Sequence, residues 1–284
     1  MIAALYCNIS KITLTLLLLL FSELCYAQTV SCKESNTYSY LLFDATNHKI
    51  LSEKRAEMQI FPASLTKVMT IYMALEAIKK GEAKIDDEIV FSEAAAEIGK
   101  LNATLTLKPK VGDKITLIDA IKALIVVSSN EAATAIAEYF AESEWQFARK
   151  MNNKAKELQM FNSNFKNASG LPDIGQYSTN YDLFKLASAI VKNFPQYYDL
   201  FAIKEFSYRG QKFKSHNNIL LQYPKAEGMK TGFTKMSGYN LIASAKRDDV
   251  RMISILTHCP SAKGRDLFTQ ELLDLAFKIQ EKNK

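Results

Sequence analysis

Gly228-Met-Lys-Thr-Gly-Phe-Thr-Lys-Met-Ser-Gly-Tyr-Asn-Leu-Ile-Ala-Ser-Ala245 is the stretch that decides the fold. It predicts two β-strands, at 226–234 and 238–245, separated by a short turn. A third strand is expected shortly afterwards, at 250–257. The last third of the chain is therefore rich in β-structure.

The other end of the chain adds strands of its own. Tyr38 to Phe43 is a β-rich run, Asp44-Ala-Thr-Asn47 is a turn signal, and Ile50-Leu51 begins a short return strand. The middle of the chain is helical instead, with helices expected at 64–80, from Thr116 to about 127, and at 130–141, 144–159 and 180–193. A strand at 204–209 and a closing helix at 264–280 complete the pattern. We predict an α+β fold: an antiparallel five-stranded sheet from both chain ends, flanked by helices, with an inserted helical subdomain.

Three short motifs follow one another in a fixed order. They are Ser64-Leu65-Thr66-Lys67, then Ser128-Ser129-Asn130, then Lys230-Thr231-Gly232. Each motif alone is weak, because short patterns of this kind arise by chance on many helices and strands. The ordered set is strong, and it is the signature of a serine acyl-transferase that accepts penicillin-like substrates.

Longer stretches around these motifs resemble one known family. Residues 61–70, 167–178 and 228–245 are similar to the serine D-Ala-D-Ala carboxypeptidases, the low-molecular-mass penicillin-binding proteins. The resemblance extends from about Tyr38 to Phe277. It implies the penicillin-binding or β-lactamase-like fold, a peptidoglycan pentapeptide substrate that loses its terminal D-alanine, and acylation of the same serine by β-lactam inhibitors.

The residues permit this chemistry without a histidine. A serine hydroxyl needs a base, and none of the three histidines lies in a recognisable triad context. Lys67 lies one helical turn after Ser64 on the same face, so its amine can reach the hydroxyl. A free lysine is protonated at neutral pH, so we expect a second cation, Lys230, to lower the pKa of Lys67 by repulsion.

The resemblance assigns further roles. The backbone N–H of Ser64, at the amino end of a helix, suits a developing oxyanion, and by resemblance the backbone N–H of Phe233 is the second donor. Ser128 would relay a proton to the leaving nitrogen, and Asn130 would hold a substrate carbonyl, although both residues also suit helix capping. The free carboxylate of the substrate would be bound by the third motif and its neighbour, namely Lys230, Thr231, Gly232 and Thr234.

Two positions depart from the family. Phe233 and Ser169 stand where some members have histidine, and neither departure removes a catalytic group. The stretch 167–180 also lacks a glutamate, which disfavours a β-lactamase with rapid deacylation. An inactive wall-binding protein is disfavoured because Ser64, Lys67 and Lys230 are all present.

An alternative within the family is a DD-endopeptidase that cuts peptidoglycan cross-links. The chain after Lys230 is long enough to finish the sheet and one helix, so no appended C-terminal β-domain is expected. By resemblance, the compact members are the endopeptidases. The closing helix carries Phe268, Leu272, Leu275 and Ile279 at helical spacing, which we interpret as a core-facing stripe that allows at most peripheral membrane contact.

The first residues are typical of an export signal. Lys11 precedes the apolar run Ile12 to Phe21, and Cys25-Tyr-Ala27 has small residues at the positions that a signal peptidase favours. A retained anchor is the alternative, but the apolar run is about half as long as a spanning helix. We expect residues 1–27 to be cleaved, leaving 28–284 as a single catalytic domain in the periplasm or outside the cell.

Two cysteines remain after cleavage, Cys32 and Cys259. An exported protein meets an oxidising environment, in which thiols pair. The two residues flank the strands 38–43 and 250–257, so a disulfide is possible if those strands are antiparallel neighbours. Two independent thiols are the alternative.

Composition excludes some classes of protein. The chain has 284 residues, of which 48% are hydrophobic, enough for a large core. Its net charge of +6 comes from dispersed lysines, so we expect no nucleic-acid partner but contact with an anionic wall or membrane surface. No motif calls for a metal or another cofactor.

Overall fold

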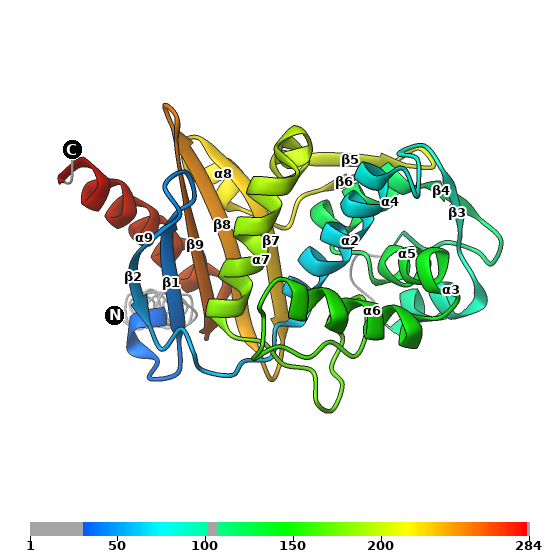
Figure 1. Cartoon of the computed structure of the whole chain (residues 1–284), viewed down its shortest axis with the longest axis horizontal. Helices are drawn as coiled ribbons and strands as arrows, with labels where there is room; N and C mark the ends of the chain where they lie inside the picture. The colour runs from blue at the N-terminus through cyan, green and yellow to red at the C-terminus, as the bar shows by residue number, and fades with distance from the viewer. Residues whose placement is uncertain (1–30, 102–106, 283–284) are drawn as a thin grey trace, which may run out of the picture.

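The computed structural model describes residues 31–101 and 107–282 (Figure 1). Strands from both ends of this chain form one antiparallel five-stranded sheet, preceded by the short helix η1 (Cys32–Glu34). The strands lie in the order β2 (Lys49–Lys54), β1 (Ser39–Asp44), β9 (Val250–Cys259), β8 (Gly238–Arg247) and β7 (Ala226–Thr234). The predicted α+β fold is confirmed.

Both faces of the sheet are buried, which explains the near-continuous apolar runs in its strands. Leu41, Phe43 and Ile255 point to one core cluster, whereas Leu42 and Leu256 point to a second. Neighbouring residues of a strand face opposite sides, so each strand supplies both cores. The two cores hold the sheet between two layers of helices.

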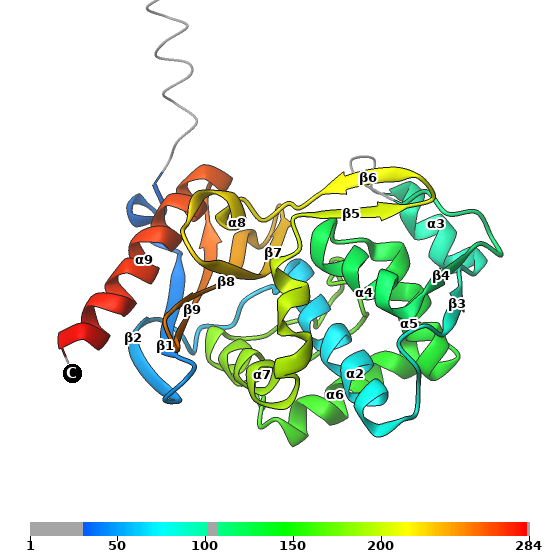
Figure 2. The same ribbon diagram turned by 90° about the horizontal axis from the view of Figure 1, so that it is seen from above.

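The closing helix α9 (Ala262–Lys282) covers one face, and the helical region covers the other (Figure 2). That region contains η2 (Ala63–Thr66), α2 (Lys67–Lys80), α3 (Glu93–Leu101), α4 (Leu117–Val126), α5 (Asn130–Ala141), α6 (Glu144–Glu157), α7 (Asn180–Asn193) and η3 (Pro195–Ala202). Most of these helices form a lobe beside the sheet (Figure 1). The inserted helical region expected from the sequence is present.

Local signals explain where the helices begin and end. Thr116 and Thr179 cap α4 and α7 by accepting hydrogen bonds from Asp119 N and Asp182 N. Helix α2 ends at Gly81, whose φ of 74° is the left-handed conformation that glycine adopts readily. These caps fix the starts of α4 and α7 and the end of α2.

One predicted strand has a different partner. The segment at 204–209 contains β5 (Glu205–Tyr208), which pairs with β6 (Gln211–Lys214) in a ribbon of its own rather than with the main sheet. Phe206 and Phe213 are buried against the helical core, so the ribbon lies over the lobe (Figure 2). The sequence pattern also did not indicate β3 (Glu88–Val90), β4 (Lys114–Thr116), α3 or the short α8 (Ile219–Gln222).

The predicted core-facing stripe on α9 is partly wrong. Phe268 and Leu272 are buried as expected, but Leu275 is 40% exposed. The buried face continues instead through Leu273 and Phe277. The helix thus packs on the sheet through a stripe that winds slightly around its axis.

The expected export signal, at 1–27, lies outside the described residues. In the part of the chain that the structure does describe, no helix combines the length and apolar character needed to cross a bilayer.

Candidate active site

Ser64 lies at the junction between sheet and lobe, on a turn tighter than expected. Residues Ala63–Thr66 form a 3₁₀ helix that leads directly into α2. In a 3₁₀ turn, side chains three residues apart eclipse each other. The tight turn therefore places the amine of Lys67 directly over the hydroxyl of Ser64, which is itself partly exposed.

Lys67 is fully buried and makes three polar contacts. Its Nζ lies 3.1 Å from Ser64 Oγ, 2.7 Å from Asn130 Oδ1 and 2.6 Å from the carbonyl oxygen of Ser169. These contacts come from η2, from α5 and from the segment before α7. One amine thus joins the first motif, the second motif and the loop that contains Ser169.

The pKa of Lys67 is lowered from 10.5 to about 7, mainly because burial disfavours the ammonium form. The carboxylates of Glu131 and Glu144 oppose this shift. The prediction that Lys230 is the cause of this shift is wrong, because burial is the main cause at Lys67. Repulsion between the two lysines instead lowers the pKa of Lys230, where it is the second cause after burial.

The two carboxylates were not found from the sequence. Glu131 is buried and accepts hydrogen bonds from Ser129 Oγ (2.9 Å) and Leu107 N (3.0 Å). Glu144 Oε1 accepts a 3.0 Å bond from Ala168 N, and burial raises the pKa of this carboxyl group. Glu131 directly follows the second motif and Glu144 begins α6, but neither is part of a motif pattern, and only the fold shows that they lie near Lys67.

The second motif forms the break between α4 and α5. Ser128 has a left-handed backbone, with a φ of 59°, and its buried Oγ has no hydrogen-bond partner among the described residues. Ser129, rather than Asn130, caps α5 by accepting from Ala132 N. The Asn130 side chain is therefore free of capping, and it faces Lys67.

The third motif lies on β7 and approaches the nucleophile closely. A Cβ added at Gly232 would lie 3.2 Å from the backbone nitrogens of both Ser64 and Leu65. Only glycine allows this approach without displacing the nucleophile turn. The backbone of β7 thus lies directly beside that of Ser64. The oxyanion-hole roles of Ser64 and Phe233 stay predictions.

The side chains around this strand differ in burial. Lys230 is 1% exposed and its Nζ donates to the carbonyl of Thr231 at 2.9 Å. Phe233 is half exposed and stacks on Tyr239, with ring centroids 4.3 Å apart. Thr234 Oγ1 accepts a 3.0 Å bond from Ser237 N in the turn to β8.

His216 was set aside in the sequence analysis, but it lies near this strand. Burial, and then the charge of Lys230, lower its pKa to about 4, so its imidazole is neutral. Its backbone N–H donates to Val126 O, at the end of α4. Its Nε2 is buried and lacks a hydrogen-bond partner within residues 31–101 and 107–282.

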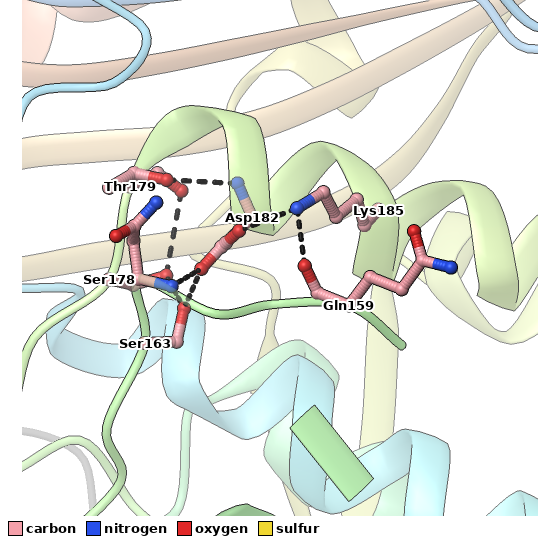
Figure 3. Close-up of polar contacts among 7 residues, drawn as sticks. Gln159, Ser163, Ser178, Thr179, Asp182 and Lys185 are labelled. Atoms are coloured by element: carbon pink, nitrogen blue, oxygen red, sulfur yellow. Dashed lines mark hydrogen bonds and ion pairs between the residues drawn. The ribbon is translucent and has the colours of Figure 1, made fainter. Parts of the chain in front are cut away.

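A buried carboxylate fixes the loop that supplies the Ser169 carbonyl (Figure 3). Asp182, on α7, accepts from Asn162 N and Ser163 Oγ, both at 2.8 Å, and pairs with Lys185 at 3.1 Å. Ser178, hydrogen-bonded to Ser163, also bridges to Ile60 in the segment before the nucleophile. The loop is thus held to α7 at one side and to the nucleophile segment at the other.

The two cysteines lie at one end of the sheet, where Cys259 pairs with Tyr239, the strand partner of Phe233. Cys32 and Cys259 are joined as a disulfide, with Cα atoms 4.9 Å apart and both side chains buried. They meet because β1 and β9 are antiparallel neighbours, with Ser39 opposite Thr257. The bond ties η1 to the end of β9.

Comparison with known proteins assigns a family to this arrangement. Residues 26–260 match the family described as D-alanyl-D-alanine carboxypeptidase. D-alanyl-D-alanine carboxypeptidase DacF of Bacillus subtilis is 32% identical over 96% of this chain and 71% of its own length. DacC of Escherichia coli is 33% identical over 93% of this chain and 67% of its own length.

A D-alanyl-D-alanine endopeptidase of Haemophilus influenzae is also similar, at 32% identity over 83% of this chain and 80% of its own length. Among solved structures, penicillin binding protein 5 from Haemophilus influenzae superimposes with a TM-score of 0.80 at 30% identity, covering 84% of this chain and 70% of that one. A penicillin-binding protein from Listeria monocytogenes, solved in its ampicillin-bound form, gives a TM-score of 0.75 at 28% identity, covering 84% and 96%.

Proposed function

Because this chain belongs to the D-alanyl-D-alanine carboxypeptidase family and is a serine peptidase, we propose that it removes the terminal D-alanine from peptidoglycan stem peptides through an acyl intermediate on Ser64. The observation that carries the proposal is the contact of 3.1 Å between Lys67 Nζ and Ser64 Oγ. With a pKa of about 7, the Lys67 amine is substantially neutral at physiological pH and can accept the proton of the hydroxyl.

The first step forms one bond and breaks another. Ser64 Oγ attacks the carbonyl carbon of the penultimate D-alanine while Lys67 takes its proton. The negative charge that develops on the carbonyl oxygen is stabilised by the N–H groups of Ser64 and Phe233. The peptide C–N bond then breaks, and the leaving amine of the terminal D-alanine receives a proton relayed through Ser128.

The unpartnered hydroxyl of Ser128 supports this relay, since a buried hydroxyl without a partner costs free energy that a bound substrate would recover. The side-chain N–H₂ of Asn130 would hold a backbone carbonyl of the substrate while its Oδ1 keeps Lys67 in place. Water then hydrolyses the ester on Ser64, with Lys67 again accepting a proton, and the shortened peptide leaves.

The free carboxylate of the substrate would bind at the start of the third motif. Lys230 and Thr231 are adjacent there, and Gly232 allows the substrate to lie close to the strand. Thr234 also lies on β7, on the same face as Lys230 and Gly232, because side chains alternate along a strand. We therefore keep Thr234 among the residues that would bind the carboxylate.

Penicillins would acylate the same serine, a proposal supported by the ampicillin-bound relative. We also propose that residues 1–27 direct export and are cleaved, leaving one catalytic domain in the periplasm or outside the cell. The disulfide between Cys32 and Cys259 supports an oxidising location.

The test is mass spectrometry of the mature protein after incubation with a labelled penicillin, together with release of D-alanine from a peptide ending in D-Ala-D-Ala. A long-lived adduct on Ser64 and release of D-alanine are expected. An adduct that hydrolyses within seconds would instead indicate a β-lactamase.

A second candidate is a DD-endopeptidase, which the Haemophilus influenzae relative favours. The acyl-transfer chemistry is the same, and only the leaving group differs. Incubation with cross-linked dimeric muropeptides decides between the two, because an endopeptidase releases monomers whereas a carboxypeptidase releases only D-alanine.

A further inference from the structure

Trp145 is the single tryptophan of the chain, and it lies on the surface. It is the second residue of α6 and is 64% exposed. Tryptophan is highly buried on average, because its indole removes a large apolar area from water when it packs. An indole left this open keeps that area available for a ligand.

Helix α6 places Trp145 beside the loop that follows it. Asn152, on the same helix, binds both backbone groups of Phe165, accepting from its N–H at 2.7 Å and donating to its carbonyl at 2.8 Å. Residues seven apart lie on one face of a helix, and Trp145 precedes Asn152 by seven. Trp145 therefore lies on the side of α6 along which this loop runs.

That loop leads directly to the proposed acylation site. Next to Trp145, the Glu144 side chain accepts a hydrogen bond of 3.0 Å from Ala168 N. The following residue of the loop is Ser169, whose carbonyl oxygen lies 2.6 Å from Lys67 Nζ. Two hydrogen bonds and a short stretch of backbone thus connect the start of α6 to the base, so the surface that carries the indole is continuous with the site.

Cationic side chains flank the indole. Arg149 lies one turn further along α6, with its Cζ 5.1 Å from the centroid of the Trp145 ring. Lys166, in the adjacent loop, is exposed, as is Arg149. Their N–H groups can donate to an oxygen-rich ligand that lies on the ring.

We propose that Trp145 stacks on a sugar ring of the glycan strand to which the stem peptides are attached, with Arg149 and Lys166 donating to the oxygens of its hydroxyl and acetamido groups. The C–H face of a pyranose is apolar and flat enough to pack on an indole, whereas its edge carries oxygens that suit cationic donors. The inference rests on the proposed function, and it applies to a carboxypeptidase and to an endopeptidase alike.

The length of the stem peptide supports this placement. The reacting carbonyl would belong to the fourth residue of the pentapeptide, and four residues of extended chain span at most about 14 Å. The sugar that carries the peptide therefore stays near the surface around Ser64 while Ser64 reacts. The start of α6 belongs to that surface through Glu144.

The first experiment compares two substrates, the free pentapeptide and the same pentapeptide attached to glycan strands. The ratio of kcat/KM for the attached peptide to kcat/KM for the free peptide measures the contribution of the glycan. Trp145→Ala should lower this ratio about fivefold, through KM rather than kcat. Arg149→Ala should lower it about twofold, and Trp145→Phe should lower it less than Trp145→Ala does.

Phe161→Ala is the matched control. Phe161 is 72% exposed, follows the opposite end of α6, and has the amine of Lys185 5.8 Å from its ring centroid. It therefore repeats the exposed ring and its cation at a place away from Trp145, and its ratio should equal that of the wild type. An equal fall in Phe161→Ala and in Trp145→Ala would contradict a specific contact at Trp145.

The second experiment observes the contact itself. Because Trp145 is the single tryptophan, the tryptophan emission of the protein comes from this ring alone. The Ser64→Ala variant is titrated with peptide-free glycan strands, with dextran and with phospholipid vesicles. A saturable shift of the emission to shorter wavelength is expected with the glycan strands only, and a shift with vesicles but not with glycan would instead assign Trp145 to a membrane surface.

Two results overturn the proposal: a ratio that Trp145→Ala leaves unchanged, or an emission that the glycan strands leave unchanged. The free pentapeptide keeps the proposed function separate from this contact. Failure of the wild type to hydrolyse it contradicts the proposed function, whereas hydrolysis with a ratio independent of Trp145 contradicts only the glycan contact.

Discussion

Lys67 Nζ lies 2.7 Å from Asn130 Oδ1, so the base of the first motif is held by the amide of the second. The contact joins α2 to α5 across the interior of the lobe. A change in either residue should therefore disturb the other, and we expect acylation to depend on both.

Ser64→Ala should abolish penicillin labelling and D-alanine release without changing the fold, because the hydroxyl is the proposed nucleophile. Lys67→Ala should reduce the acylation rate by about 10²-fold or more, as expected for loss of a general base. Intact-mass measurement with a labelled penicillin checks both variants, and circular dichroism checks folding. Covalent labelling that persists in Ser64→Ala would contradict the assignment.

The acylation rate should rise with pH and reach half its maximum near pH 7. Lys67 is active only when neutral, and its lowered pKa of about 7 sets the midpoint. Below that pH the amine is protonated and cannot accept the serine proton. Stopped-flow acylation between pH 5 and 9 measures this limb, and a midpoint near the free lysine value would show that Lys67 is not the base.

Glu144→Gln should move this limb to lower pH. The carboxylate of Glu144 favours the ammonium form of Lys67, so its removal lowers the pKa of that amine. Glutamine keeps an oxygen that can accept from Ala168 N, so the loop should stay in place. Glu53→Gln, an exposed change on β2, is the control and should leave the limb unmoved.

Gly170→Ala should impair folding and acylation together. Its Cβ would overlap the carbonyl oxygen of Ala63, which requires the loop to move and withdraws the Ser169 carbonyl from Lys67. We expect a loss of stability of about 3 kcal/mol or more. Gly81→Ala is the matched control: its φ of 74° is also left-handed, but no described atom lies within 4 Å, so it should cost only about 1 kcal/mol.

The mature protein should contain no free thiol when it is denatured without reductant, because Cys32 and Cys259 are joined. Reduction should lower Tm, and the chain-entropy model gives an upper figure of about 4 to 5 kcal/mol for so long a loop. Titration with a thiol reagent decides the first point. Two reactive thiols per chain would show that the bond does not form in the exported protein.

Much of this fold could be predicted because its helices carry local signals. Helix α5 spans Asn130–Ala141 as expected, since a break in the apolar pattern and a polar cap mark its start. The pattern at 204–209 marked a strand but could not identify its partner. The choice between β6 and the main sheet depends on tertiary packing of Phe206.

The candidate site was less predictable than its motifs. Ser64 and Lys67 were found because their motif stands in a fixed order with the two other motifs. The reason for the lowered pKa of Lys67 could not be found from the sequence, because the burial of Lys67 depends on residues distant in sequence. Glu144 and the carbonyl of Ser169 belong to no motif, and only the folded chain brings them to Lys67.

The pairing of β1 with β9 has a consequence for the order in which the enzyme folds. Ser39 can pair with Thr257 only after nearly all of the chain has been synthesised. Strand β1 therefore lacks its partner β9 while the helical region is being made. Contacts between such distant residues slow folding and leave strand edges exposed meanwhile. The third motif on β7 also follows the helical region in the chain, so the candidate site is complete only once the last strands have joined the sheet.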